Sequence, residues 1–73
     1  MDKREACHRL AEINEAIYDA QNDLERINSR LVWDDPSNRE RLLEEKERVE
    51  ARLEQYKREH DDFIAEYGDI IYS

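Results

Sequence analysis

The sequence predicts an all-α fold, an antiparallel hairpin of two long helices that resembles a coiled coil. Two observations carry this prediction. The 73 residues contain a single proline, Pro36, and a single glycine, Gly68, so two long segments run without a helix breaker. On both sides of the proline, apolar residues recur at alternating spacings of three and four, which is the heptad pattern of helices that pack along one seam. At this length one domain is expected.

The first helix is expected at about residues 3–33. Side chains spaced alternately three and four residues apart lie on one side of a helix. Such a seam runs through Ala6, Leu10, Ile13, Ile17, Ala20, Leu24, Ile27 and Leu31. This unbroken repeat is the strongest structural signal in the chain, and it places Leu10 at heptad position a and Ile13 at position d.

The turn is expected at residues 34–36, because the residue before a proline avoids helical geometry. Two start signals for the second helix follow, and the sequence leaves both open. In one, Asp35 is the N-cap and Pro36 occupies the first helical position. In the other, Ser37 and Glu40 form a capping box. Either signal places the reversal of the chain near the proline.

The second helix is expected at about residues 37–67. Its seam is more polar and consists of Leu42, Lys46, Val49, Leu53, Tyr56, His60, Phe63, Tyr67 and Ile70. Folding the chain back at Pro36 places residues opposite one another when their numbers sum to 73, as Leu10 and Phe63 do. Gly68 is expected to end the helix, which leaves residues 68–73 as a short tail that covers the open end of the hairpin or binds a partner.

The two polar residues of the second seam each have an ordinary explanation. Lys46 is expected to extend its ammonium group to water and to help fix the register. His60 is expected to pack with one hydrogen bond. The alternative for His60 is a pH-sensitive contact, because histidine changes charge near neutrality.

The first helix also carries a flank prepared for a second neighbour. Its e positions are Cys7, Asn14, Gln21 and Asn28, although exposed coiled-coil flanks usually carry Glu or Lys there. The predicted dimer face adds apolar residues beside both seams, and as a whole it consists of Cys7, Ala11, Asn14, Gln21, Asn28, Leu43 and Ile64. We therefore expect a homodimer that forms a four-helix bundle.

Composition limits the classes of partner. Charged residues make up 44% of the chain and the net charge is −8, which opposes direct binding of nucleic acid or of an anionic membrane. The complement is a basic protein surface, such as that of a DNA-binding regulator. The only cysteine excludes a disulfide within the chain and fits a reducing compartment, and no signal core is present. We expect a soluble protein of the cytoplasm, or of the host cytoplasm if the source is viral.

Catalysis has no candidate residues in this sequence. It contains no Gly-rich phosphate loop, and no serine or cysteine has a local acid and base beside it. Glu5 and His8 have the spacing of a di-iron motif, and Cys7 beside His8 could begin a zinc site. However, the Glu5 and His8 positions face solvent, so an ordinary solvated surface is preferred. We expect neither an enzyme nor a cofactor.

Binding of another protein is the remaining class of function. Tyrosine and tryptophan are enriched at the centres of protein interfaces, and acidic side chains suit a basic partner. The candidate contact residues are Tyr18, Trp33, Glu12, Asp19, Asp62, Ile71 and Tyr72. Trp33 either plugs the end of the bundle or anchors a partner, and Tyr18 belongs to the dimer packing or to a contact surface.

In size, charge and absence of catalytic features, the whole chain resembles the small helical proteins with which bacterial viruses inhibit host regulators. This resemblance implies a dimeric inhibitor that docks on a larger protein, and it specifies no site residue. The alternatives are a structural coiled-coil or assembly component and an acidic DNA mimic. The mimic has to accommodate the seven basic residues of positions 34–73.

Overall fold

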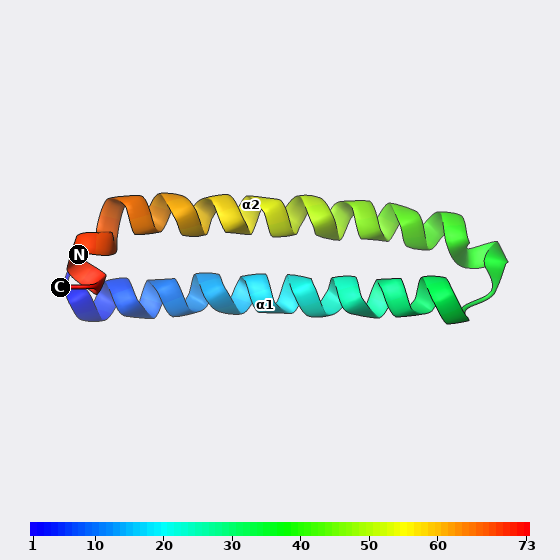
Figure 1. The fold of residues 1–73 in the computed structure, drawn as a ribbon, viewed down its shortest axis with the longest axis horizontal. Coiled ribbons are helices and arrows are strands. Elements are labelled where there is room, and N and C mark those ends of the chain that lie inside the picture. The colour runs from blue at the N-terminus through cyan, green and yellow to red at the C-terminus, as the bar shows by residue number, and fades with distance from the viewer.

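The computed structural model describes residues 1–73 and shows one antiparallel helical hairpin (Figure 1). Helix α1 spans Lys3–Trp33, the 3-10 turn η1 spans Pro36–Asn38, and helix α2 spans Arg39–Ile71. The arms lie side by side along the length of the molecule, which measures 52 × 15 × 13 Å. The structure thus confirms an all-helical, two-helix fold with its reversal at the proline.

Helix α1 begins and ends at local capping contacts. Asp2 is the N-cap, and its Oδ1 accepts a hydrogen bond from the backbone N–H of Glu5 at 2.8 Å. This bond satisfies one of the amide groups that lack a partner at a helix start. At the other end, Asp34 turns to extended geometry while its N–H still donates to the Arg30 carbonyl at 2.8 Å. The helix therefore ends at Trp33, two residues before the Asp35–Pro36 bond.

The turn uses the first of the two predicted start signals. Asp35 is extended, and its Oδ1 accepts a hydrogen bond from the Ser37 N–H at 3.0 Å, with Pro36 at the first position of η1. The alternative capping box is not formed, since Asn38 precedes α2 and makes no side-chain cap. Because η1 takes up three residues, α2 starts at Arg39 instead of residue 37.

The predicted helix end at Gly68 is wrong. Helix α2 continues to Ile71, and the N–H of Tyr72 donates to the Gly68 carbonyl at 2.9 Å. No glycine has a positive φ, so Gly68 does not adopt the left-handed geometry of a glycine cap. The last turn of α2 bends across the open end of the hairpin toward the start of α1 (Figure 1). Residues 68–71 are therefore helical, and only Tyr72 and Ser73 follow the helix.

The two seams form the core, as their spacing predicts. Every residue of both seams is buried or half-buried. The most buried are Ala6, Ala20, Ile27 and Leu42, exposed by 0, 3, 7 and 5%. Small residues among them allow the helix backbones to approach closely, since layers of small and large side chains fill space together. His60 and Lys46 are half-buried in the seam of α2.

The register of the arms lies within about one helical turn of the predicted one. Ile27 and Val49 line the same hollow between the arms, and Ile13 and Phe63 line another. The rule of numbers that sum to 73 would place Ile27 opposite Lys46, three residues from Val49. The direction of the arms agrees with that rule, and its individual pairs stay predictions.

The hairpin leaves much of its surface open. Its accessible area is 5901 Å², whereas a compact protein of this mass, 8.9 kDa, exposes about 4,800 Å². Four of the 73 residues are buried, and none of the large side chains is fully enclosed. A thin pair of helices therefore has exposed area to spare for a further neighbour. Neither helix offers an apolar stretch long enough to traverse a lipid bilayer.

Candidate protein-binding surfaces

The hairpin has two different sides. In each helix, heptad position g is the residue before an a residue of the seam, and position e is the residue after a d residue. In an antiparallel pair, the g positions of both helices lie along one side of the seam and the e positions along the other. We call the g side the charged flank. On it, α1 carries Arg9, Asp23 and Arg30, and α2 carries Glu66, Arg52 and Glu45. Opposite charges share the same hollows, Arg9 with Glu66 in one and the other four residues in another. The arms thus complement one another on this side.

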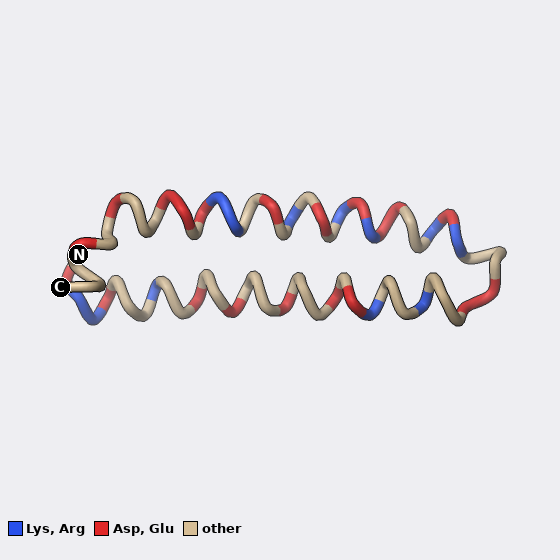
Figure 2. Tube along the Cα trace, viewed as in Figure 1, with Lys and Arg blue, Asp and Glu red and all other residues tan.

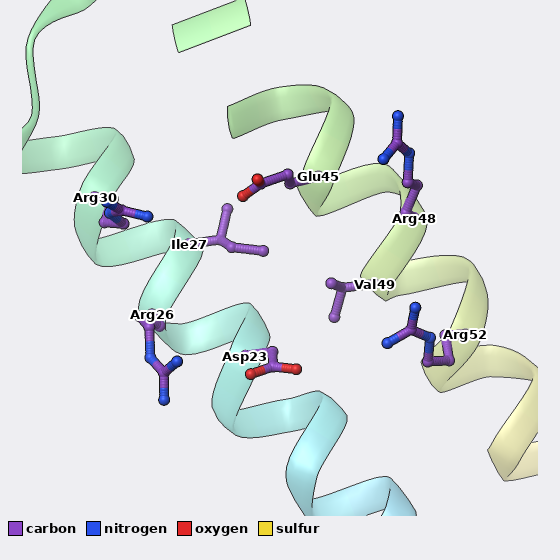
Figure 3. A pocket seen from close by; sticks show the side chains of 8 residues that line it. All are labelled: Asp23, Arg26, Ile27, Arg30, Glu45, Arg48, Val49 and Arg52. Carbon is purple, nitrogen blue, oxygen red and sulfur yellow. The ribbon is translucent and has the colours of Figure 1, made fainter. Parts of the chain in front are cut away.

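The larger of these hollows shows the arrangement in detail (Figure 3). It measures about 310 Å³, and Ile27 and Val49 form its apolar floor. Asp23 and Arg52 reach toward one another across it, while the Glu45 carboxylate points toward α1. Four arginines surround the hollow: Arg26, Arg30, Arg48 and Arg52. All ion pairs within 4.0 Å join residues of the same arm or its cap, such as Glu54 with Arg58 at 3.7 Å. The charges across the hollow therefore interact at longer range.

The opposite side of α1 forms an uncharged stripe. It consists of Cys7, Ala11, Asn14, Tyr18, Gln21 and Asn28, which are all exposed. Tyr18 is 67% exposed, so it packs against nothing within the hairpin. Their spacing alternates between four and three from Cys7 to Gln21 on the e and b positions of α1, and the next b position holds the exposed Glu25. The stripe has the pattern of a second helix-packing seam that the hairpin itself leaves open.

In α2, the residues that follow the d residues of its seam, such as Leu43 after Leu42, lie beside this stripe at the e positions. Leu43 is 45% exposed and Ile64 is half-buried. Between them lie Glu50 and Lys57, which line a hollow of about 330 Å³ with the seam residues Leu24 and Leu53. This second hollow is on the uncharged side of α1, so the predicted dimer residues of both arms share one face of the hairpin.

The tip of the hairpin presents the most exposed large side chains. Trp33 is 84% exposed and Val32 is 71% exposed. Within the single hairpin, Trp33 therefore covers nothing, and its role as a plug of a bundle end or as an anchor for a partner stays a prediction. The turn that presents it is held by local bonds, since the Asp35 N–H donates to Asp34 Oδ1 at 3.0 Å and the Asp34 carboxylate lies 4.0 Å from Arg30 Nε. Two apolar side chains next to Asp34 and Asp35 make this tip an acidic, aromatic projection.

Of the predicted acidic contacts, Glu12 and Asp62 lie toward the open end, whereas Asp19 lies near the middle of α1. Glu12 accepts from Arg9 at 3.1 Å and lies 3.1 Å from His8. Asp62 lines a hollow with Arg9, Ile13 and Glu66, among other residues. Asp19 is exposed. Red segments prevail toward the end of the molecule that holds the termini, whereas blue segments are frequent toward the turn (Figure 2). Glu12 and Asp62, which both lie beside Arg9 of the charged flank, are therefore on a different side from Tyr18.

The end of α2 lies against the start of α1. Lys3 Nζ donates to the backbone oxygen of Ser73 at 2.8 Å, and Ser73 Oγ donates to the Ile70 carbonyl at 2.8 Å. Ile71 is half-buried, whereas Tyr72 is 74% exposed. This is the covering role that the sequence left open for the apolar tail. Of the two predicted contact residues here, Tyr72 alone is open to a partner.

The weaker chemical candidates do not assemble into a site. No group of three His, Cys, Asp or Glu side chains is arranged to hold a metal ion. His8 lies against Glu12, and Cys7 is a free, exposed thiol. His60 Nδ1 lies 3.4 Å from Asp61 Oδ1 on the same helix, so its one polar neighbour is local.

The candidate contact residues thus fall into separate places: the tip with Trp33, the stripe with Tyr18, and the open end with Glu12, Asp62 and Tyr72. Sequence reasoning missed the charged flank and the exposure of Val32. The signal for the flank was present in the chain, because Asp23 and Arg30 recur seven residues apart in α1, as Glu45 and Arg52 do in α2.

Comparison with known proteins gives no relative for this chain: no family model, no curated protein and no solved structure matches it.

Proposed function

We propose that this hairpin is a non-enzymatic protein-binding module, a small dimeric regulator or inhibitor that docks on a larger protein. The observation that carries the proposal is Trp33, 84% exposed beside Val32 in a turn held by hydrogen bonds. Tryptophan is the residue type most enriched among the few that dominate binding energy at interfaces. A fixed turn presents this side chain with little conformational entropy left to lose on binding.

The chemistry of the tip defines the partner. Trp33 and Val32 require an apolar pocket, while Asp34 and Asp35 beside them favour basic residues at its rim. A protein that binds DNA has such a basic surface. This agrees with the net charge of −8 and with the type of inhibitor that the sequence resembles. The thinness of the fold, 15 × 13 Å across its two shorter dimensions, supports a role in binding instead of catalysis, because it leaves no room for an enclosed ligand pocket.

The dimer part of the proposal is supported by area. The hairpin exposes 5901 Å², about 1,100 Å² more than a compact protein of its mass. A standard protein interface buries about 800 Å² on each partner. Covering the face of the uncharged stripe and of Leu43 with a second copy would bring this thin molecule to ordinary compactness as a four-helix bundle.

Capture of a partner tests the proposal. The tagged chain and its Trp33→Ala variant would be used as baits in lysate of the source cells, with Gln55→Ala as the control, because Gln55 is an exposed residue of α2 outside the predicted contacts. A stoichiometric partner should be retained by the wild type and by the control and lost by Trp33→Ala. With the purified partner, emission of the only tryptophan should shift to the blue on binding. Equal retention by Trp33→Ala would overturn the proposal for the tip.

The acidic open end is tested in the same way. Reversal of Glu12, Asp19 and Asp62 to lysine should weaken capture if the partner is basic, and high salt should act in the same direction. Capture that is insensitive to both changes would remove the electrostatic part of the proposal and leave the aromatic part.

A second candidate function is that of a structural coiled-coil or assembly component. It is favoured by the shape of the molecule, a rod of 52 × 15 × 13 Å, and the experiment with Trp33→Ala separates it from the first. The DNA mimic is disfavoured by the four arginines that surround one hollow of the charged flank, because they interrupt the negative surface that a nucleic-acid cleft would meet.

A further inference from the structure

We propose that the face formed by the uncharged stripe of α1 and the e positions of α2 binds a second copy of the chain in one defined orientation. The turn of one hairpin then lies against the open end of the other. Helix α2 then packs antiparallel on the partner's α2, and α1 on the partner's α1, about a single two-fold axis. This inference rests on the dimer proposed above and adds its direction and register.

The charged flank shows which residues of the two arms are level. Its opposite charges pair Arg9 with Glu66, Asp23 with Arg52 and Arg30 with Glu45, and the numbers in each pair sum to 75. Members of each pair line the same hollow. A residue of α1 and a residue of α2 therefore lie within about one helical turn of the same height when their numbers sum to about 75.

The e positions of α2 form a row that complements itself. The first four read Leu43, Glu50, Lys57 and Ile64, seven residues apart, and the fifth, Ile71, lies in the last turn of α2 that bends toward α1. If two such rows run antiparallel, Leu43 meets Ile64 of the second copy and Glu50 meets Lys57, each contact occurring twice as a two-fold axis requires. If the turns lay together instead, the two-fold axis would run along the hairpin and place α2 on the partner's α1, so that Glu50 and Lys57 would face the stripe and not an opposite charge. The axis for the antiparallel arrangement lies between Leu53 and Glu54.

The three amides of the stripe on α1, Asn14, Gln21 and Asn28, are centred on Gln21, at nearly the same height as that axis, and Cys7 lies outside this group. With Gln21 on the axis, Asn14 meets Asn28 of the second copy and Gln21 meets itself, so amides pair with amides. Gln21 and Glu54 have numbers that sum to 75, the level relation given by the charged flank. A single two-fold axis, which lies between the two hairpins and runs across their helices, therefore relates α1 to the partner's α1 and α2 to the partner's α2. The hollow beside it is lined by Leu24, Leu53, Glu50 and Lys57, among others, and its two charges would meet their opposites there.

The overall charge favours the same direction. A plane through the axis divides the chain into two halves. The open-end half, residues 1–21 and 54–73, has eleven acidic and five basic residues. The turn half, residues 22–53, has nine acidic and seven basic residues. The net charges are −6 and −2. Placing turns together would set the two −6 halves against one another, whereas the proposed direction sets each against a −2 half. Salt screens this effect, so the contacts of the α2 row define the register.

A distance measurement tests the direction. Spin labels would be attached to Ser37→Cys in a Cys7→Ser background, at the exposed turn. At a rise of 1.5 Å per residue, the two turns of the proposed dimer lie about 50 Å apart, whereas turns placed together lie within about 20 Å. A dimeric mass by light scattering with the long distance supports the inference. A dimer with the short distance overturns the orientation alone, and a monomer overturns the dimer with it. Neither result bears on capture through Trp33.

A charge exchange tests the register. Glu50→Lys alone places lysine against Lys57 of the second copy, and Lys57→Glu alone places glutamate against Glu50. Each should raise the dissociation constant of the dimer at least several-fold, and the double variant should restore it. Circular dichroism checks that each variant stays helical. Failure of the double variant to restore the dimer, or single variants without effect, would overturn the proposed pairing. Glu44→Lys with Arg58→Glu, on exposed f positions of α2 away from the row, is the matched control.

Discussion

At the scale of single residues, the hairpin is stabilised by a small number of close contacts. Ile27 is 7% exposed in the seam, while Val32, five residues further along the same helix, is 71% exposed. The two are both β-branched aliphatic residues in α1, so their helix propensities are nearly the same. The comparison between them separates burial from local preference.

Ile27→Ala should destabilise the fold by about 2 to 4 kcal/mol, through lost apolar burial and the cavity left behind. Val32→Ala should change stability by about 0.5 kcal/mol or less, since its side chain is in water. Urea unfolding followed by circular dichroism measures both. Equal effects of the two substitutions would contradict the assignment of Ile27 to the core.

The residue that the sequence left most open is Trp33. The structure shows its side chain in solvent in the single hairpin, which is compatible with an anchor for a partner and with a plug between two copies. Its exposure depends on how far α1 runs and on where the turn directs the chain, and neither is encoded in the tryptophan itself. For the same reason the spacing of α1 could place Tyr18 outside the seam but could not specify what covers it.

At the scale of elements, the turn and the end of α2 show how local chemistry sets boundaries. Asp35 and Ser37 were both acceptable caps, and the structure uses the carboxylate of Asp35. Pro36 already has the φ that the first position of a helical turn needs and offers no N–H that would lack a partner. A cap immediately before the proline therefore leaves fewer backbone N–H groups without a partner than a cap at Ser37 does.

Asp35→Ala should lower the stability of the hairpin by about 1 kcal/mol, because the Ser37 N–H loses its acceptor. Ser37→Ala is the control, since the Ser37 side chain makes no hydrogen bond in the turn. Thermal melting of the two variants and the wild type measures the difference. A larger loss for Ser37→Ala would indicate that the capping box operates in solution.

Gly68→Ala should stabilise α2 by about 0.5 to 1 kcal/mol, because glycine has an entropic disadvantage within a helix. An added Cβ would meet Ile64 Cγ2 at 3.6 Å, an ordinary contact, and the glycine has no positive φ. Chemical denaturation at fixed protein concentration is the measurement. A destabilised variant would show that the bend at the end of α2 depends on the missing side chain.

At the scale of the whole molecule, the hairpin is asymmetric across its seam. One side carries complementary charges of its own two arms, and the other carries an uncharged stripe with no partner in the chain. Exposed ion pairs contribute little to stability, so the charged flank acts chiefly on register and direction. The exposed area on the other side is large enough for a second copy to cover, and this is the basis of the proposed dimer.

The double variant Tyr18→Lys with Gln21→Glu should dissociate the proposed dimer while the helix content stays the same, because it introduces charges into the stripe. Glu12→Gln with Asp19→Asn, on α1 but outside the stripe, is the control and should leave the mass unchanged. Light scattering across a dilution series reports the mass. A dimer that persists in the first variant would contradict the face assigned to self-association.

The sequence by itself determined the two helices, their seams, the reversal at Pro36 and the acidic character of the molecule. These features follow from local rules, since apolar periodicity and the restrictions of proline act within a few residues. Only the tertiary structure decided that α2 continues through Gly68, that Trp33 is exposed and that Asp23 faces Arg52. Each of these depends on how one arm is placed against the other. A periodic pattern does not determine that register to better than about one helical turn.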